Sequence, residues 1–342
     1  MVDRTQAIGG YFELELDVGV ELHGGALSLN SGRNCFRYAL QRHKPSKIYL
    51  PYYICDTMVD VAKSSGISWG FYALDKNMEL SEPIEPQQNE ILLYVNYFGL
   101  KTSYADKLAD RFGCSVVIDN SQAFFVEPNS HAHTIYSARK FFGVPDGGYL
   151  YTDLLPDVDE IPEDTAVDRC CHLLGRIEAG SQAYYSAYRN AESALRGRPI
   201  RKMSRISKRI LASLDYESIA LKRERNFLFL HTHLAPVNTY PIVIDASFKG
   251  PMIYPLLIRD GSSLKQKLIE EEIYVATYWP EVKLRNNAPS LECSLVDNLV
   301  PLPIDQRYTL SDMQRIVAVI ENWLAQRGYK PRNQLLPNKH NY

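Results

Sequence analysis

The sequence predicts an α/β protein whose large domain is built on a mainly parallel sheet, and three observations support this fold class. Short apolar runs alternate with segments of helical periodicity between residues 33 and 151, as expected when helices connect parallel strands. One of these runs ends in Asp119, at the sheet edge where α/β proteins place ligands. Near Leu154 the alternation ends, a long helical region follows up to residue 235, and a second α/β pattern comes after it. We therefore expect a large domain over 1–235 and a smaller C-terminal α/β domain over 236–342.

The elements of the large domain are expected from the spacing of apolar residues. Runs with strand character occupy 47–51, 69–74, 91–96, 116–119 and 148–151. Helical spacing occupies 33–43, 56–65 and 103–112. A polar, acidic stretch over 154–168 then leads into a long helical region over 169–235, which Pro199 is expected to break.

The C-terminal part shows a second α/β pattern. Strands are expected at 252–258 and 273–278, around a helix over 262–271. A closing helix over 311–327 carries Asp312 in its first turn, where an acid interacts favourably with the helix dipole.

Composition restricts the function classes. The chain has 342 residues, 45% of them hydrophobic, and a formal net charge of -2, which gives no reason to expect nucleic acid or an anionic membrane as a partner. No signal-peptide pattern or membrane-length apolar run occurs, so we expect a cytoplasmic protein. The six cysteines and eight histidines show no complete set of metal ligands, so no metal is expected.

One charged segment is an exception to the balanced composition. The segment 196–209 contains seven basic residues, namely Arg196, Arg198, Arg201, Lys202, Arg205, Lys208 and Arg209. The segment could be a solvated helix face, or it could neutralise a phosphate or pyrophosphate.

Asp119, Ser137 and Lys140 are the candidate catalytic and cofactor-binding residues. Asp119 ends a buried strand, and Ser137 and Lys140 follow with a spacing of three that places them on one face of a helical turn. A carboxylate that keeps a ring nitrogen protonated, a serine that binds phosphate and a lysine that forms an imine are what pyridoxal phosphate requires. Each residue alone is more often an ordinary turn or surface residue, so the order and spacing matter.

These residues and their surroundings resemble the fold-type I pyridoxal-phosphate enzymes, and most of all the DegT/DnrJ/EryC1/StrS sugar aminotransferase family. The resemblance is carried by the blocks 9–15, 29–34, 119–122, 137–148 and 273–280. It implies a pyridoxal-phosphate-dependent transferase fold of the aspartate aminotransferase type, with pyridoxal 5'-phosphate as the cofactor.

The resemblance implies a role for each matched residue at the cofactor ring. Lys140 matches the lysine that forms the imine and then moves the proton during the reaction. Asp119 matches the partner of the pyridine nitrogen, and Gln122 matches the residue that hydrogen-bonds the ring oxygen. The alternative is that Gln122 is only a polar residue at a helix start.

The phosphate site is expected at the turn of Ser31, Gly32 and Arg33, which leads into a helix. The matching turn in the family uses backbone N–H groups at the helix start, which suits an anion. Arg33 stands where relatives usually have threonine. Ser137 would add a further hydrogen bond to the phosphate.

Two further cofactor contacts are expected with alternatives. Either Tyr53 stacks on the cofactor ring in a shifted register, or Cys55 packs there. In relatives the neighbouring subunit completes the phosphate site from the segment that here contains Lys202, so Lys202 could serve a homodimer with shared active sites.

Near the C-terminus, Arg307 could bind a substrate carboxylate, or it could form a salt bridge with Asp305. The short Ser137–Lys140 spacing is more like the aspartate aminotransferase branch than the sugar enzymes.

We therefore predict an aminotransferase that moves an amino group from glutamate to a nucleotide-linked keto-sugar, in polysaccharide or secondary-metabolite biosynthesis. Lys140 favours this over a pyridoxal-phosphate lyase or dehydratase, since sugar dehydratases of the family carry histidine there. A non-catalytic binding or scaffold protein is the alternative outside enzymes. A nicotinamide-binding protein is disfavoured because no strand precedes a Gly-x-Gly-x-x-Gly turn.

Overall fold

The computed structural model describes residues 8–154 and 160–328, and its largest element is a seven-stranded sheet. The strand order is β1-β7-β6-β5-β4-β2-β3. Strands β2 to β6 run parallel, whereas β7 is antiparallel to both of its neighbours, β6 and β1. The strands are β1 Leu27–Leu29, β2 Lys47–Pro51, β3 Ser68–Tyr72, β4 Glu90–Val95, β5 Val116–Asp119, β6 His133–Ser137 and β7 Gly148–Tyr151. The predicted fold class is confirmed.

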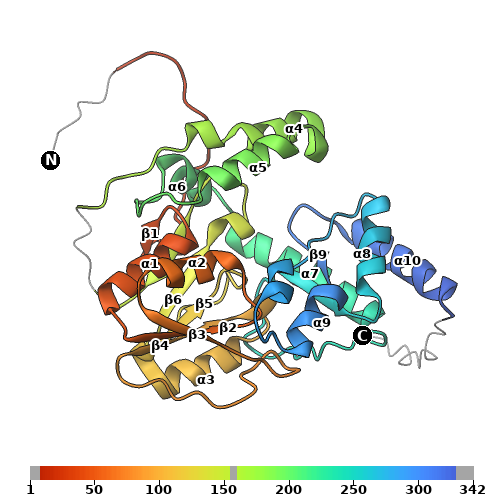
Figure 1. The fold of residues 1–342 in the computed structure, drawn as a ribbon. Coiled ribbons are helices and arrows are strands. Elements are labelled where there is room, and N and C mark those ends of the chain that lie inside the picture. Colours follow the sequence, from red (N-terminus) through yellow and green to blue (C-terminus); the bar gives the residue numbers. More distant parts are fainter. Residues whose placement is uncertain (1–7, 155–159, 329–342) are drawn as a thin grey trace.

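Helices cover both faces of this sheet, with α1 and α2 on one side and α3 on the other (Figure 1). These helices are α1 Gly32–His43, α2 Asp56–Ser64 and α3 Thr102–Phe112. The Ser31 side chain caps α1 by accepting a hydrogen bond from the Asn34 amide at 3.2 Å. Gly113, with φ of 53°, ends α3 in a conformation that favours glycine.

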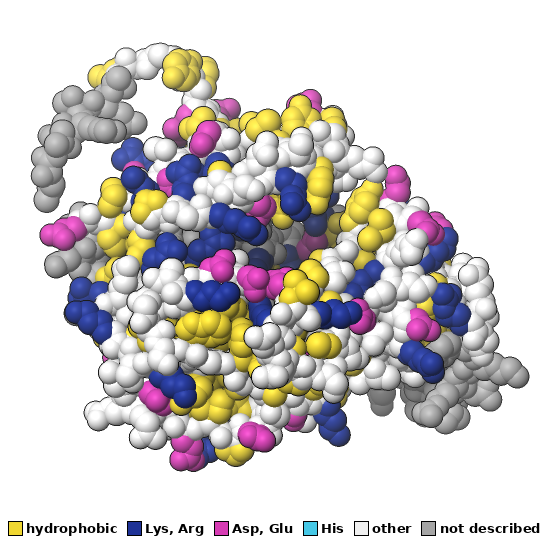
Figure 2. Space-filling model, in the orientation of Figure 1, with side chains coloured by type: hydrophobic (Ala, Val, Ile, Leu, Met, Phe, Trp, Pro, Cys, Tyr) yellow, Lys and Arg dark blue, Asp and Glu magenta, His cyan; other side chains and the backbone are white. Residues whose placement is uncertain are grey.

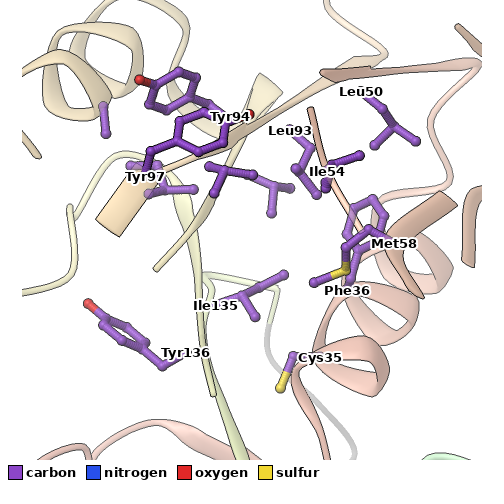
Figure 3. Close-up of a cluster of buried hydrophobic side chains, with 14 of the residues drawn as sticks. Cys35, Phe36, Leu50, Ile54, Met58, Leu93, Tyr94, Tyr97, Ile135 and Tyr136 are labelled. Carbon is purple, nitrogen blue, oxygen red and sulfur yellow. The ribbon is translucent and has the colours of Figure 1, made fainter. Parts of the chain in front are cut away.

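The core between the sheet and α1 and α2 explains the order of these elements. Cys35 and Phe36 of α1 and Met58 of α2 pack against strand residues such as Leu93 and Ile135 (Figure 3). Strands β4 and β5 are buried along almost their whole length, which accounts for their unbroken apolar sequences.

The middle of the chain is helical, as predicted, with a break that contains Pro199. Its helices are α4 Cys171–Ala183, α5 Tyr185–Ala194, α6 Arg205–Ala212 and α7 Tyr216–Leu234. Short 3-10 turns occur at Tyr97–Gly99, Gly113–Ser115, Ala138–Lys140, Val167–Arg169 and Pro280–Leu284. Helices α4 and α5 lie together at the top of the view in Figure 1, and α7 leads into the C-terminal part.

A second hydrophobic core lies in the C-terminal part. It joins the two-stranded antiparallel sheet of β8 Ile253–Leu257 and β9 Leu299–Pro303 to α8 Gly261–Glu270, α10 Leu310–Gln326 and the end of α7. Helix α9, Ser290–Asn298, packs mainly with the first core. A domain boundary at residue 235 stays a prediction.

Part of the secondary structure differs from the expectation. The predicted strand at 273–278 is wrong, since this segment pairs with no described strand, and Tyr274, Ala276 and Tyr278 face a cleft instead. Strands β1, β6 and β9 and helix α9 were not expected. Strand β9 contains Pro301 and Pro303, and its position at a sheet edge explains how it tolerates them. Among the described residues, no helix combines the length and apolar character needed to cross a membrane.

Candidate active site

Strand β5 carries Asp119 to the carboxyl edge of the sheet. The carboxylate is only 4% exposed, and its Oδ1 accepts a hydrogen bond from the Ser121 amide at 2.9 Å. Because β5 and β6 are parallel neighbours, their carboxyl ends meet at the same edge. Ser137, the last residue of β6, therefore lies close to the end of β5.

Lys140 follows β6 in the 3-10 turn Ala138–Lys140. The turn is fixed at its start because the Ala138 amide donates to the Gly147 carbonyl at 3.2 Å. Its end is fixed because the Phe141 amide donates to the Ala138 carbonyl at 3.0 Å. The Lys140 side chain is solvent-accessible and lines an open cleft.

Asp119 and Lys140 line the same cleft, which has a volume of about 610 Å³. Figure 2 shows a hollow near the centre of the visible face, with Lys and Arg side chains around it. Cys55 also lines the cleft, and the charges of Asp119 and Lys140 both affect the pKa of its thiol. Burial and the Asp119 charge raise the pKa of the Cys55 thiol, and the Lys140 charge opposes the rise.

The start of helix α1 forms another wall of the cleft. Gly32 and Arg33 lie in its first turn, and neither of their amides donates a hydrogen bond to a described residue. Strand β7 packs very close here, since a Cβ atom on Gly148 would lie 2.5 Å from the Gly32 nitrogen. The amides of this turn are thus held at the cleft as potential anion donors.

The Arg33 side chain spans from α1 to α2. Its guanidinium donates hydrogen bonds to the Leu195 carbonyl at 3.0 Å and to the Thr57 hydroxyl at 3.3 Å. Burial lowers the pKa of this guanidinium. Arg33 forms no ion pair with any residue in the described ranges. Its positive charge at the cleft is therefore not neutralised by a direct carboxylate contact.

Gln122 also lines the cleft and is almost fully buried. Its Oε1 accepts a hydrogen bond from the Phe98 amide at 2.8 Å. This bond orients the side-chain NH₂ group as the remaining donor.

Tyr53 and Lys202 do not line the cleft. Tyr53 is fully buried and packs edge-on against Trp279, with ring centroids 4.8 Å apart, so Cys55 and not Tyr53 faces the cleft in this chain. Lys202 lies in a segment that pairs by single bridges with Leu29 and Glu163. A contribution of Lys202 to a neighbouring subunit's site stays a prediction.

The basic segment 196–209 is partly neutralised within the chain. Arg198 pairs with Asp164 at 3.1 Å, and Arg205 pairs with Glu163 at 2.8 Å. Two of its seven basic residues thus pair with the acidic stretch that precedes α4.

Arg223 of α7 is a residue of the cleft wall that the sequence analysis missed. It is 2% exposed and donates to Gln306 Oε1 at 2.9 Å and to the Phe141 carbonyl at 3.4 Å. Gln306 also donates to that carbonyl, at 2.8 Å. Burial lowers the pKa of Arg223 to about 10. The residue after Lys140 is thus held from the C-terminal part of the chain.

Arg285 forms a similar connection to the turn before α2. Its guanidinium donates to the Tyr52 and Ile54 carbonyls and to the Asp56 carboxylate. The Glu281 carboxylate accepts a hydrogen bond from the Asp56 amide at 3.1 Å. The position of Cys55 therefore depends on residues more than two hundred positions away in the sequence.

Other lining residues were also missed, because no local pattern marks them. Arg139 pairs with Glu192 of α5, Tyr188 reaches the cleft from the same helix, and Leu195 reaches it from the residue that follows this helix. Arg307 donates two hydrogen bonds to the Asp305 carboxylate, at 2.7 and 2.8 Å. This is the salt bridge that the sequence analysis gave as one alternative to binding a substrate carboxylate. Burial raises the pKa of the Asp305 carboxyl, but the Arg307 contacts outweigh this and the net shift is downward.

Comparison with known proteins gives matches in structure but none in sequence. No family model and no curated protein matches the chain. DesV of S. venezuelae, solved with a ketimine intermediate, is 19% identical, with 87% of this chain and 84% of DesV covered and a TM-score of 0.63. DesI, solved in the presence of its TDP-sugar product, is 17% identical, with 89% and 81% covered and a TM-score of 0.61.

A DegT DnrJ EryC1 StrS aminotransferase from Brucella abortus matches at 16% identity, with 87% of this chain and 86% of that one covered and a TM-score of 0.59. Further structures of this fold are described as holding the cofactor in its PMP form. This chain therefore has the fold of the DegT/DnrJ/EryC1/StrS sugar aminotransferases, which are fold-type I pyridoxal-phosphate enzymes.

Proposed function

We propose that this protein is a pyridoxal-phosphate-dependent aminotransferase. One observation carries the proposal: a buried carboxylate, Asp119, and a primary amine, Lys140, line one cleft whose wall is the start of helix α1. A ring nitrogen, an aldehyde carbon and a phosphate need these three features in one cavity. The shared fold supports the same conclusion independently.

The residues of the cleft fit this cofactor. The free amides of Gly32 and Arg33, the Ser31 and Ser137 hydroxyls and the Arg33 guanidinium would hold the phosphate. Asp119 would hold the ring nitrogen, and the Gln122 amide would reach the ring oxygen. Cys55 would lie against the ring. When bound, pyridoxal phosphate supplies an electron sink for the negative charge that develops on the substrate α-carbon.

Side chains of the cleft would move the proton, stabilise the charge on the ring and exclude water. Lys140 Nζ would take a proton from the substrate α-carbon and hold it for the later protonation step, which requires that the amine be unprotonated at the start. The Asp119 carboxylate, which is buried and already oriented by the Ser121 amide, would accept a hydrogen bond from the protonated ring nitrogen and stabilise its positive charge. Tyr278 and Trp279 line the cleft, and their rings would exclude water from that side of a bound substrate.

We propose glutamate as the amino donor and a nucleotide-linked keto-sugar as the acceptor, in polysaccharide or secondary-metabolite biosynthesis. Support for the acceptor comes from the fold shared with DesI, which was solved with a TDP-sugar product. We also propose a homodimer in which Lys202 approaches the phosphate site of the neighbouring subunit. The basic segment 196–209, only part of which is paired within the chain, would be available for that contact.

The test is spectroscopic. The purified protein with added pyridoxal phosphate should develop a visible absorption band, and Lys140→Ala should lose it. Lys107→Ala, at an exposed lysine of α3, is the matched control and should keep the band. A band that persists in Lys140→Ala would contradict the assignment of the lysine.

Glutamate then separates the candidate functions. An aminotransferase should lose the visible band and release 2-oxoglutarate in equal amount. A lyase or dehydratase should release no 2-oxoglutarate. A scaffold protein should show neither change.

A further inference from the structure

Two acidic side chains, Asp146 and Asp164, are buried behind the cleft and share one arginine. Nη2 of Arg169, itself only 2% exposed, donates to Asp146 Oδ2 at 3.1 Å and to Asp164 Oδ2 at 3.3 Å. Asp146 also accepts hydrogen bonds from the Ser204 hydroxyl, at 2.9 Å, and from the Ser207 hydroxyl. None of these five residues lines the cleft, so they would not touch a molecule bound there.

Asp164 holds the residue that precedes the start of helix α1. Its Oδ2 accepts a hydrogen bond from Asn30 Nδ2 at 3.1 Å, and Asn30 is fully buried. The Asn30 amide also donates to the Arg201 carbonyl at 2.9 Å. Asn30 directly precedes Ser31 and Gly32, which line the cleft. Asp164 therefore helps to fix the turn whose amides are the potential anion donors.

Asp146 holds the turn that leads into strand β7. The next residue, Gly147, has φ of 129°, a backbone conformation that favours glycine. The Gly147 amide donates to the Asn30 carbonyl at 3.1 Å, and the Gly147 carbonyl accepts from the Ala138 amide at 3.2 Å. Gly147 is therefore bonded both to the residue before the α1 turn and to the first residue of the turn that carries Lys140.

These contacts close into a continuous loop, which we call the Arg169 network. It runs from Arg169 through Asp164, Asn30, Gly147 and Asp146 and back to Arg169. The network joins the α1 turn to the Lys140 turn from behind the cleft. Because these turns carry the proposed anchors for the phosphate and for the aldehyde, the network controls the distance between the two anchors.

The stability of the fold does not explain the composition of this network. Nε and Nη1 of Arg169 are buried, and neither has a hydrogen-bond partner within the described part of the chain. Taking an arginine and two carboxylates out of water costs free energy that their mutual attraction often fails to offset, and an unsatisfied buried donor adds to the cost. Buried ion pairs do select a single geometry in some proteins. A required geometry accounts better for these charges than added stability does.

We propose that Arg169 and Asn30 are positioning residues that set the spacing between the phosphate anchor at α1 and the amine of Lys140. The proposal rests on the proposed function, since it takes pyridoxal phosphate as the molecule that spans both anchors. A molecule held at two correctly spaced points binds more tightly than its separate parts do. Opening the network should therefore weaken the binding of pyridoxal phosphate and leave the binding of pyridoxal and of inorganic phosphate unchanged.

Three affinities of the full-length protein test the proposal. Titration of the visible band gives the dissociation constants of pyridoxal phosphate and of pyridoxal, and competition with pyridoxal phosphate gives that of inorganic phosphate. Asn30→Ala is the main variant, because it opens the network but leaves Asp164 paired with Arg169 and Arg198. The dissociation constant of pyridoxal phosphate should rise about tenfold, whereas the other two should change less than about twofold.

A second variant and a matched control accompany Asn30→Ala. Arg169→Met opens the network between the two acids and should weaken pyridoxal phosphate by at least the same factor. Asp168→Asn also removes a carboxylate near Arg169, at 3.9 Å, but this side chain is exposed and outside the network, so all three affinities should stay unchanged. Asn30→Ala leaves no buried charge without a partner, so it decides the test even if Arg169→Met does not fold.

The proposal is overturned if Asn30→Ala binds pyridoxal phosphate as tightly as the wild type does. It is also overturned if pyridoxal or inorganic phosphate loses as much affinity as pyridoxal phosphate, because this would indicate damage to one anchor and not a change in spacing. A failure of the proposed function looks different. The wild type would then form no visible band with either aldehyde, which would remove both proposals.

Discussion

Gly148 lets strand β7 approach the start of helix α1, and replacing it with alanine tests whether this approach sets the anion site. A Cβ atom there would lie 2.5 Å from the Gly32 nitrogen and 2.8 Å from the Ser31 carbonyl oxygen. Real Cβ contacts essentially never fall below 3.0 Å, so strand and helix must separate by about 0.5 Å, the difference between 3.0 and 2.5 Å. Gly148 does not have positive φ, so the effect would come from this contact and not from backbone strain.

We expect Gly148→Ala to lower the free energy of unfolding by about 2 kcal/mol, in the range of overpacked sites. The affinity for pyridoxal phosphate should fall about tenfold, because the displaced amides no longer converge on the phosphate. Urea unfolding measures the first quantity, and titration of the visible band measures the second.

Gly70 provides the matched control. It lies in β3 of the same sheet, and a Cβ atom there would meet nothing within 4 Å. Gly70→Ala should change the free energy of unfolding by less than about 0.5 kcal/mol. If Gly148→Ala matches Gly70→Ala in both stability and cofactor affinity, the close approach of β7 does not shape the site.

Three further substitutions test other parts of the reasoning. Asp119→Asn should leave the fold intact but slow transamination about 100-fold or more in stopped-flow assays, since the neutral amide cannot keep the ring nitrogen protonated. Arg223→Met should lower the free energy of unfolding by about 3 kcal/mol in urea, because Gln306 and several carbonyls lose their donor, whereas exposed Arg225→Met should have little effect. His23 is buried, its Nε2 donates to the Phe124 carbonyl at 2.8 Å, and burial lowers its pKa from 6.5 to about 4. Between those pH values the unfolded chain binds the proton more readily than the folded one, so stability should fall by about 3 kcal/mol on acidification, and His23→Gln should flatten this slope.

The parts of the site that the sequence predicted are those encoded by local spacing. Asp119 ends a buried strand, and Ser137 and Lys140 follow within one turn, so the order of residues alone suggested their proximity. Arg223 gave no such signal, because a single arginine in a helix is ordinarily a surface residue. Its burial depends on packing between segments far apart in the chain, which no local pattern reports.

The errors in secondary structure have physical causes of the same kind. The segment 273–278 has a strand-like composition, but a strand also needs a neighbour, and its residues line the cleft instead. Strand β9 was missed because prolines argue against a strand unless it lies at an edge. The choice between Tyr53 and Cys55 likewise required the tertiary structure, which buries the ring against Trp279.

The contacts of Arg285 and Gln306 with the turns around Cys55 and Lys140 have a consequence for biosynthesis. On the ribosome, the sheet and its first helices can form early, but the turn around Cys55 lacks its contacts until Arg285 has emerged, and the turn around Lys140 lacks its contact until Gln306 has emerged. A nascent or truncated polypeptide that lacks these residues should therefore hold neither turn in place and should bind the proposed cofactor weakly.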